Sequence, residues 1–231
     1  MTQQAKLFIS FTVLSGACLI GYCLSAEDSA SLSTGYSLCI LLTVLASMLK
    51  VRLPGITGTI SVNFVFILFA VAVFTFQETV LLAAAGGLVQ CLWRANRRPN
   101  AIQVGFNVAT LAISGGATYR VAHLFVGANQ SFLMALLSIA GACYFTADTL
   151  LVSGVLSLIE HKPLLAIWRQ CYFWSFPYYM VGGLITALVV ATYRLLGWQM
   201  ALLTLPVLYL VFVFYRMCVE RMVKTSAGTV P

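Results

Sequence analysis

The chain has 231 residues, of which 61% are hydrophobic and 8% are charged, and its mean hydropathy is +0.97. Because a soluble globular domain is about one-quarter charged, this composition excludes a water-soluble globular protein and predicts an integral membrane protein. The net charge of +7 is explained by basic residues beside anionic lipid head groups, so we expect no nucleic-acid partner.

Eight apolar runs follow one another along the chain, and each is a candidate transmembrane helix. A hydrocarbon core about 30 Å thick needs about 20 apolar residues per helix, so these runs leave no room for a separate soluble domain. We therefore predict an all-α, polytopic helical bundle that forms a single transmembrane domain over residues 1–231. The predicted spans are residues 7–25, 36–49, 60–76, 79–93, 101–124, 131–159, 171–193 and 199–218.

The basic residues predict the orientation of this bundle. Eleven of the 13 Lys and Arg residues fall at alternate ends of the runs, whereas Arg120 and Arg194 fall at the opposite ends. Since Lys and Arg are retained in the cytoplasm during insertion, we expect both termini to be cytoplasmic in a multi-pass protein of the cell (inner or plasma) membrane. The same residues form either a cytoplasmic docking surface or a charge cluster that only sets orientation. The surface comprises Lys50, Arg52, Arg94, Arg97, Arg98 and Arg169.

Asp148 is an acidic residue near the middle of the predicted span 131–159. A carboxylate at this depth costs several kcal/mol unless it is protonated, hydrogen-bonded or facing a polar cavity. Two interpretations follow. Asp148 is a ligand or proton site, or it is a neutral carboxyl bonded to a neighbouring helix with Thr149 or Tyr144 contributing locally.

Three amides and an aromatic segment complete the candidate ligand-binding set. Asn63, Gln90 and Asn107 lie at similar predicted depth in three spans, where amides either hydrogen-bond between helices or contact a polar ligand. The segment 172–179 contains Trp174 and is dense in aromatic residues. It is either part of the aromatic belt at the membrane interface or a stacking wall for a flat ligand.

The motifs of hydrolases and nucleotide-binding enzymes are missing from the chain. There is no HExxH, GxSxG or Walker sequence, and His123 and His161 are predicted on opposite sides of the membrane. The seven cysteines are scattered without the paired spacing of a zinc site or a disulfide framework. We therefore expect no enzyme, no catalytic residues, no cofactor and no metal.

Three stretches, residues 52–64, 88–99 and 171–179, resemble the vitamin-uptake-like membrane sensor domain of bacteria, and the similarity extends over residues 50–217. Domains of that family commonly precede cytoplasmic HD-GYP or GGDEF domains. They are considered distant relatives of the substrate-binding subunits of energy-coupling-factor transporters. No set of ligand residues comes with the resemblance.

The resemblance implies a sensor-like module that binds a small molecule within the helix bundle and signals through cytoplasmic loops or a partner. The sequence ends about a dozen residues after its last predicted span, so we expect that partner to be a separate signalling or energising protein. Two alternatives are a membrane subunit of a vitamin-like uptake transporter and a membrane scaffold without a ligand.

Overall fold

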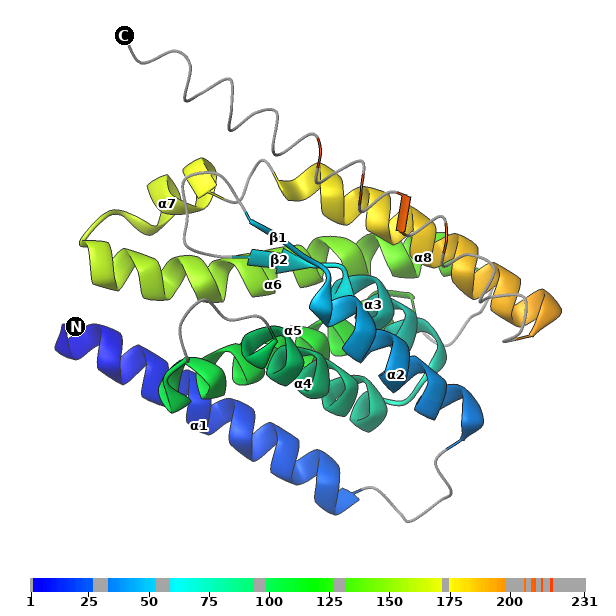
Figure 1. The fold of residues 1–231 in the computed structure, drawn as a ribbon, viewed down its shortest axis with the longest axis horizontal. Helices are drawn as coiled ribbons and strands as arrows, with labels where there is room; N and C mark the ends of the chain where they lie inside the picture. Colours follow the sequence, from blue (N-terminus) through cyan, green and yellow to red (C-terminus); the bar gives the residue numbers. More distant parts are fainter. Residues whose placement is uncertain are drawn as a thin grey trace, which may run out of the picture.

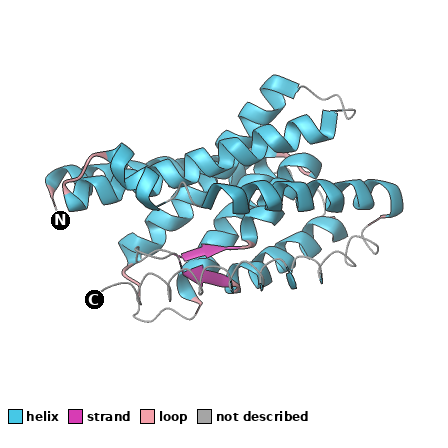
Figure 2. Ribbon diagram, turned by 90° about the horizontal axis from the view of Figure 1, so that it is seen from above, coloured by secondary structure: helices cyan, strands magenta, loops and turns pink. Residues whose placement is uncertain are grey.

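The structure is a computed structural model that describes residues 2–26, 33–52, 59–93, 99–126, 132–171 and 175–197, with 206, 209, 210, 213 and 217. These residues form a bundle of helices with one short β-hairpin (Figures 1 and 2). The elements are α1 (Gln3–Ala26), α2 (Thr34–Met48), β1 (Lys50–Arg52), β2 (Thr59–Ser61), α3 (Asn63–Val73), α4 (Phe76–Leu92), α5 (Ala101–Val126), α6 (Leu133–Glu160), α7 (Leu164–Cys171) and α8 (Phe176–Leu196).

The helical class predicted from the sequence is confirmed, and the first six apolar runs each correspond to one helix, α1 to α6. The seventh run has a different boundary. The predicted span 171–193 is replaced by the end of α7 at Cys171 and by α8, which begins at Phe176. Pro177 lies in the first turn of α8. Backbone N–H groups in the first turn have no acceptor within the helix, so a proline there costs no hydrogen bond, and its fixed φ favours a helix start. Most of the predicted span 199–218 lies outside the described residues.

Among the described helices, α1, α6 and α8 are long and apolar enough to cross a membrane. Helices α2, α3 and α4 are apolar but shorter. The 26-residue α5 has sufficient length, but polar residues such as Gln103 and Arg120 lower its hydropathy. Three candidate spans are compatible with a membrane protein, and the number eight stays a prediction.

The connection between α2 and α3 contains a β-hairpin that the sequence did not predict. Its strands pair antiparallel, with Lys50 opposite Ser61 and Arg52 opposite Thr59. The pairing satisfies backbone N–H and C=O groups within the segment itself. It also leads the chain directly into α3, two residues after Ser61.

Helix α3 lies at the centre of the bundle, where it packs against α2, α4, α6 and α8 (Figure 1). Every residue from Asn63 to Val71 is buried, as expected for a helix that is apolar on all sides. Helix α8 approaches α3 closely at Gly182, because glycine has no side chain and the Phe64 ring occupies the space that a side chain would fill. The Thr186 hydroxyl also donates to the Val65 carbonyl at 3.3 Å.

The helix ends gather in two groups at opposite ends of the bundle. The Tyr36 hydroxyl donates to the Glu78 carbonyl at 3.1 Å, so the starts of α2 and α4 lie together. At that same end the Arg120 guanidinium lies 4.4 Å from the Phe76 ring centroid. Arg194 Nη2 donates to the Ala72 carbonyl at 3.3 Å. Both basic residues that depart from the charge alternation therefore have a local partner.

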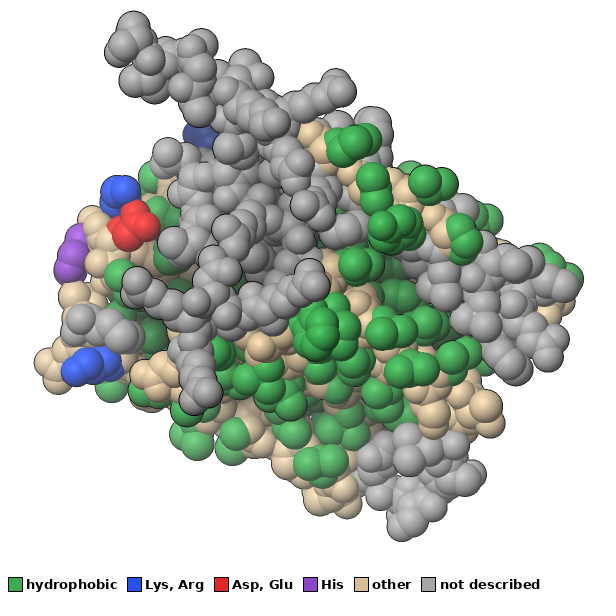
Figure 3. All heavy atoms as spheres, viewed as in Figure 1, with side chains coloured by type: hydrophobic (Ala, Val, Ile, Leu, Met, Phe, Trp, Pro, Cys, Tyr) green, Lys and Arg blue, Asp and Glu red, His purple; other side chains and the backbone are tan. Residues whose placement is uncertain are grey.

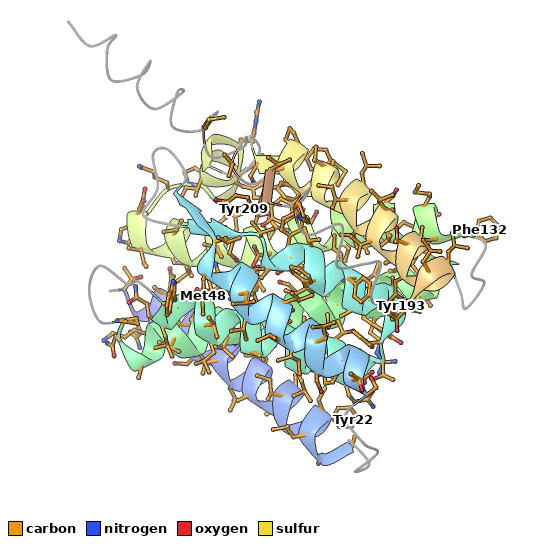
Figure 4. All side chains as sticks on the ribbon, turned by 45° about the vertical axis from the view of Figure 1, so that its right-hand side comes forward. Tyr22, Met48, Phe132, Tyr193 and Tyr209 are labelled. Carbon is orange, nitrogen blue, oxygen red and sulfur yellow. The ribbon has the colours of Figure 1, made fainter. Side chains whose placement is uncertain are left out.

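Side chains mark the two ends in the stick view. Tyr22 at the end of α1, Phe132 before α6 and Tyr193 near the end of α8 lie toward one end, and Met48 at the end of α2 lies toward the other (Figure 4). The Thr2 hydroxyl donates to the Leu158 carbonyl at 3.0 Å, which places the start of α1 beside the end of α6. Helix α6 therefore runs antiparallel to α1.

The surface of the described residues is largely apolar. In the space-filling view, hydrophobic side chains cover much of the visible face, and charged side chains gather where α1 begins, α6 ends and α7 lies (Figure 3). An exposed apolar area on this scale is typical of a protein that contacts lipid or another protein. Exposed examples on α1 and α8 are Leu7, Phe11, Leu14, Leu184 and Leu188.

Candidate functional site

Two polar clusters lie next to the first turn of α3. Two consecutive residues of that helix each contact one of these clusters. We call Ser61, Asn63 and Gln90 the amide cluster, and Tyr144, Asp148 and Tyr179 the acid cluster. Asn63 belongs to the first, whereas the Phe64 ring packs against the second. The clusters contain four of the six residues predicted as ligand contacts.

The amide cluster joins the hairpin, α3 and α4 through hydrogen bonds. Gln90 Oε1 accepts a bond from Ser61 Oγ at 2.9 Å and another from Asn63 Nδ2 at 3.1 Å. Asn63 is 3% exposed. A Cβ at Gly86 would lie 3.1 Å from Asn63 Nδ2 and 3.3 Å from Ser47 Oγ, so the glycine allows α4 to approach these groups closely. The donors and the acceptor satisfy one another, which favours interhelical bonding over ligand contact.

Asn107 is not part of this cluster. It lies on an exposed position of α5, and its Nδ2 is 3.0 Å from Cys91 Sγ. The backbone of α5 approaches α4 here, because a Cβ at Gly87 would lie 3.2 Å from the Cα of Val108. The structure therefore brings Asn63 and Gln90 together and places Asn107 on another side of α4.

The acid cluster joins α6 to α8. Tyr179 Oη donates to Asp148 Oδ2 at 3.3 Å. Tyr144 precedes Asp148 by four residues, and therefore lies on the same face of α6. The ring centroids of Tyr144 and Tyr179 are 6.2 Å apart. Both tyrosines are buried, and Asp148 as a whole residue has intermediate exposure.

Further aromatic rings surround Tyr179 on its buried side. Its ring centroid lies 4.7 Å from that of Phe64 and 5.2 Å from that of Phe145. Tyr178 is the next residue on α8, and its ring lies 5.1 Å from Phe64. Tilted and edge-to-face pairs of this kind each contribute about 1 kcal/mol beyond area burial. The rings hold the Tyr179 hydroxyl in place toward Asp148.

The short helix α7 is attached to α6 beside Asp148. Trp168 Nε1 donates to Thr149 Oγ1 at 2.9 Å, and the Trp168 ring lies 6.0 Å from that of Phe145. Thr149 is 1% exposed and follows Asp148 directly. Arg169, the next residue of α7, is exposed. The bond between Thr149 and Trp168 therefore links the residue next to Asp148 with the residue next to the exposed Arg169.

Asp148 has no cationic partner within the described residues. Their one ion pair joins Lys162 to Glu160 at 2.9 Å, near the end of α6. No three His, Cys, Asp or Glu side chains gather in a metal-binding group in this part of the chain. The acid cluster thus presents a carboxylate, tyrosine hydroxyls and aromatic faces.

The predicted basic surface is described only in part. Arg169 lies in the last turn of α7, and Lys50 and Arg52 lie on β1, of which only the backbone is described. Arg94, Arg97 and Arg98 lie outside the described residues, as does Trp174.

Sequence reasoning did not single out Tyr179, Phe64 or Trp168. Tyr179 belongs to the aromatic segment from which Trp174 was selected, so the density of that segment was a usable signal. Phe64 directly follows Asn63, but nothing in the sequence pairs it with α8. Trp168 lies in an eight-residue helix too short to give a periodic pattern.

No protein-family model, curated protein or solved structure matches this chain. The resemblance to the vitamin-uptake-like sensor domain therefore stays a prediction.

Proposed function

We propose that this chain is a receptor-like module of the cytoplasmic membrane that binds a small molecule at the acid cluster and signals to a partner protein. In this proposal the chain crosses the membrane eight times, with both termini in the cytoplasm. The ligand lies between α6 and α8, beside Asp148. The bilayer supplies the environment for the apolar surface.

One observation supports the proposal most strongly. Asp148 lies among apolar and aromatic side chains, accepts one hydrogen bond from Tyr179, and has no cation beside it in the described residues. A carboxyl group in such surroundings is costly without a partner. Tyr179 is the one hydrogen-bond donor that Asp148 has among the described residues, whereas the amide cluster has its own internal partners.

The attachment of α7 supports a route for the signal. A ligand changes an equilibrium only if it binds one arrangement of the helices better than another. Because Trp168 is bonded to Thr149, a displacement of α6 at Asp148 moves α7 and the exposed Arg169. A partner that binds the basic surface would sense this displacement.

The test is to purify the full chain in a mild detergent and to identify bound small molecules by native mass spectrometry. We expect a ligand that co-purifies with wild type and is depleted in Asp148→Asn. Glu160→Gln is the matched control, since it removes an acidic group from the same helix at a site paired with Lys162. Retention of the ligand by Asp148→Asn contradicts the site, and absence of any ligand from wild type contradicts the function.

Proteins that co-purify with the chain separate the remaining functions. A diguanylate cyclase or phosphodiesterase supports sensing, and an ATPase supports an uptake transporter. A stable partner without any ligand supports a scaffold. Reporter fusions after residues 26 and 98 test the orientation, because the proposal requires them on opposite sides of the membrane.

A further inference from the structure

Three buried hydroxyl groups on α5 have no hydrogen-bond partner among the described residues. They belong to Thr110, Ser114 and Thr118, which we call the hydroxyl stripe because residues four apart lie on one face of a helix. Each of the three residues is 1% exposed or less. A buried hydroxyl without a partner has lost its bonds to water and gained none instead, so the stripe is costly in the arrangement that the structure shows.

The other buried threonines of the described helices donate to the carbonyl four residues earlier, which is a common bond for a helical threonine. The Thr43 hydroxyl donates to the Cys39 carbonyl at 2.7 Å, and the Thr186 hydroxyl donates to the Gly182 carbonyl at 2.8 Å. One further buried hydroxyl without a partner, on Ser153 of α6, is isolated, because the hydroxyls one turn to either side of it are bonded. The hydroxyl stripe therefore differs from the rest of the described helices at three successive turns.

The hydroxyl stripe lies on the side of α5 that packs against α6. Phe106, one turn before Thr110 on the same face, belongs to one buried cluster with Val155 of α6. Helices α5 and α6 are in contact along the bundle. A molecule that bonds to the stripe therefore lies between these two helices.

The other sides of α5 are closed by contacts at glycine. Ala109 occupies the space that a side chain at Gly16 of α1 would fill, and a Cβ at Gly116 would lie 3.2 Å from Val80 of α4. For the described glycines of α5 and α6 themselves, the nearest contacts of this kind lie in α1, α4 or α8 and not across the interface between α5 and α6. These two helices can therefore move apart without loss of a close contact at glycine.

We infer that water enters between α5 and α6 and bonds to the hydroxyl stripe. Side chains four residues apart on a helix lie about 6 Å apart, a distance that one bridging water molecule spans with a hydrogen bond to each hydroxyl. Ser114 lies between Thr110 and Thr118, so it shares a bridging water with each of them. A small separation of α6 from α5 admits these waters. The inference goes beyond the proposed function, because it does not depend on the ligand of the acid cluster.

The experiment measures the transfer of magnetisation from water protons to threonine side chains by solid-state NMR, with the full chain in phosphatidylcholine vesicles. Thr43 and Thr186 are the matched controls, because they are as buried as Thr110 and Thr118 but are bonded within their own helices. We expect the transfer to Thr110 and Thr118 to be several-fold faster than the transfer to the controls. Valine substitution of each threonine in turn assigns its signal.

Removal of the central hydroxyl tests the bridge. Ser114→Ala should slow the transfer to Thr110 and Thr118, because each bridging water loses one partner. Ser47→Ala is the control, since it removes an equally buried hydroxyl that donates to the Thr43 carbonyl of its own helix at 2.7 Å. It should leave the transfer to Thr110 and Thr118 unchanged.

Two outcomes overturn the inference. Transfer to Thr110 and Thr118 that is as slow as transfer to Thr43 and Thr186 means that the interface is dry and that the hydroxyls turn to carbonyls of α5. Fast transfer that Ser114→Ala leaves unchanged means that no water is shared along the stripe. Neither outcome affects the proposed function, which is tested by ligand retention at Asp148.

Discussion

The amide cluster and the acid cluster adjoin consecutive residues of α3, but their polar atoms are satisfied differently. In the amide cluster, Ser61 and Asn63 both donate to Gln90, and the bonds tie the hairpin, α3 and α4 together. In the acid cluster, Asp148 accepts from Tyr179 and has no cation nearby in the described residues. A buried polar group bonded to its neighbours stabilises the fold, whereas a carboxyl group in apolar surroundings without a cation beside it is costly.

The contact between Phe64 and Gly182 gives the largest expected effect. Gly182→Ala places a Cβ against the Phe64 ring, which is 1% exposed and has no room to move. We expect the free energy of unfolding in detergent to fall by about 3 kcal/mol, measured by titration with a denaturing detergent. Gly183→Ala is the matched control, because the nearest atom to its Cβ is 4.0 Å away. Equal losses in the two variants contradict the close approach of α8 to α3.

Removal of a donor from the amide cluster tests whether its role is structural. Asn63→Ala takes away the bond to Gln90 at a position that is 3% exposed, and the free energy of unfolding should fall by about 2 kcal/mol. The same titration of Asn107→Ala should show a change below about 0.5 kcal/mol, since Asn107 is exposed. If Asn63→Ala instead keeps its stability and loses bound ligand, the amide cluster binds the ligand and its structural role is contradicted.

The attachment of α7 should show an intermediate effect. Thr149→Val removes the acceptor of the Trp168 N–H, and we expect a loss of about 1 kcal/mol with a change in the Trp168 environment seen by fluorescence. Thr146→Val is the control, because the Thr146 hydroxyl is exposed and bonds to the Ala142 carbonyl of its own helix at 2.7 Å. Similar behaviour of the two valine variants argues against a link between α7 and Asp148.

Asp148→Asn should have the smallest effect on stability and the largest on ligand retention. The amide oxygen still accepts from Tyr179, and the variant removes a carboxyl group without a cationic neighbour in the described residues. The free energy of unfolding of the ligand-free protein should rise by less than about 1 kcal/mol. A marked loss of stability in the same titration means that Asp148 is a structural residue like Asn63.

Local composition was sufficient to predict most of the helices. Continuous apolar runs located α1 to α6, because burial in lipid or protein requires such runs whatever their partners are. The hairpin was missed because three-residue strands give no periodic pattern, and the start of α8 was misplaced because the aromatic residues before Pro177 extend the apolar run.

Two of the three residues of the acid cluster, Asp148 and Tyr144, were predicted from the sequence. Asp148 is conspicuous because a carboxyl group interrupts an apolar helix, and Tyr144 follows from helical spacing on the same face. Tyr179 reaches Asp148 across 31 residues of sequence, and Phe64 lies still further from α8. Such contacts depend on how the helices cross, which one sequence without structural information does not specify. The bond between Asn63 and Gln90, which joins two predicted spans, is of the same kind.

The central position of α3 has a consequence for biosynthesis. Its carbonyl at Val65 is bonded to Thr186, 121 residues later in the chain, and α8 is the helix that covers Phe64. At a translation rate of about 5–20 residues per second, this separation corresponds to a delay on the order of ten seconds. During that interval α3, the most apolar of the described helices, is already made but lacks its final neighbour, so lipid or an insertion factor must shield it until α8 is synthesised.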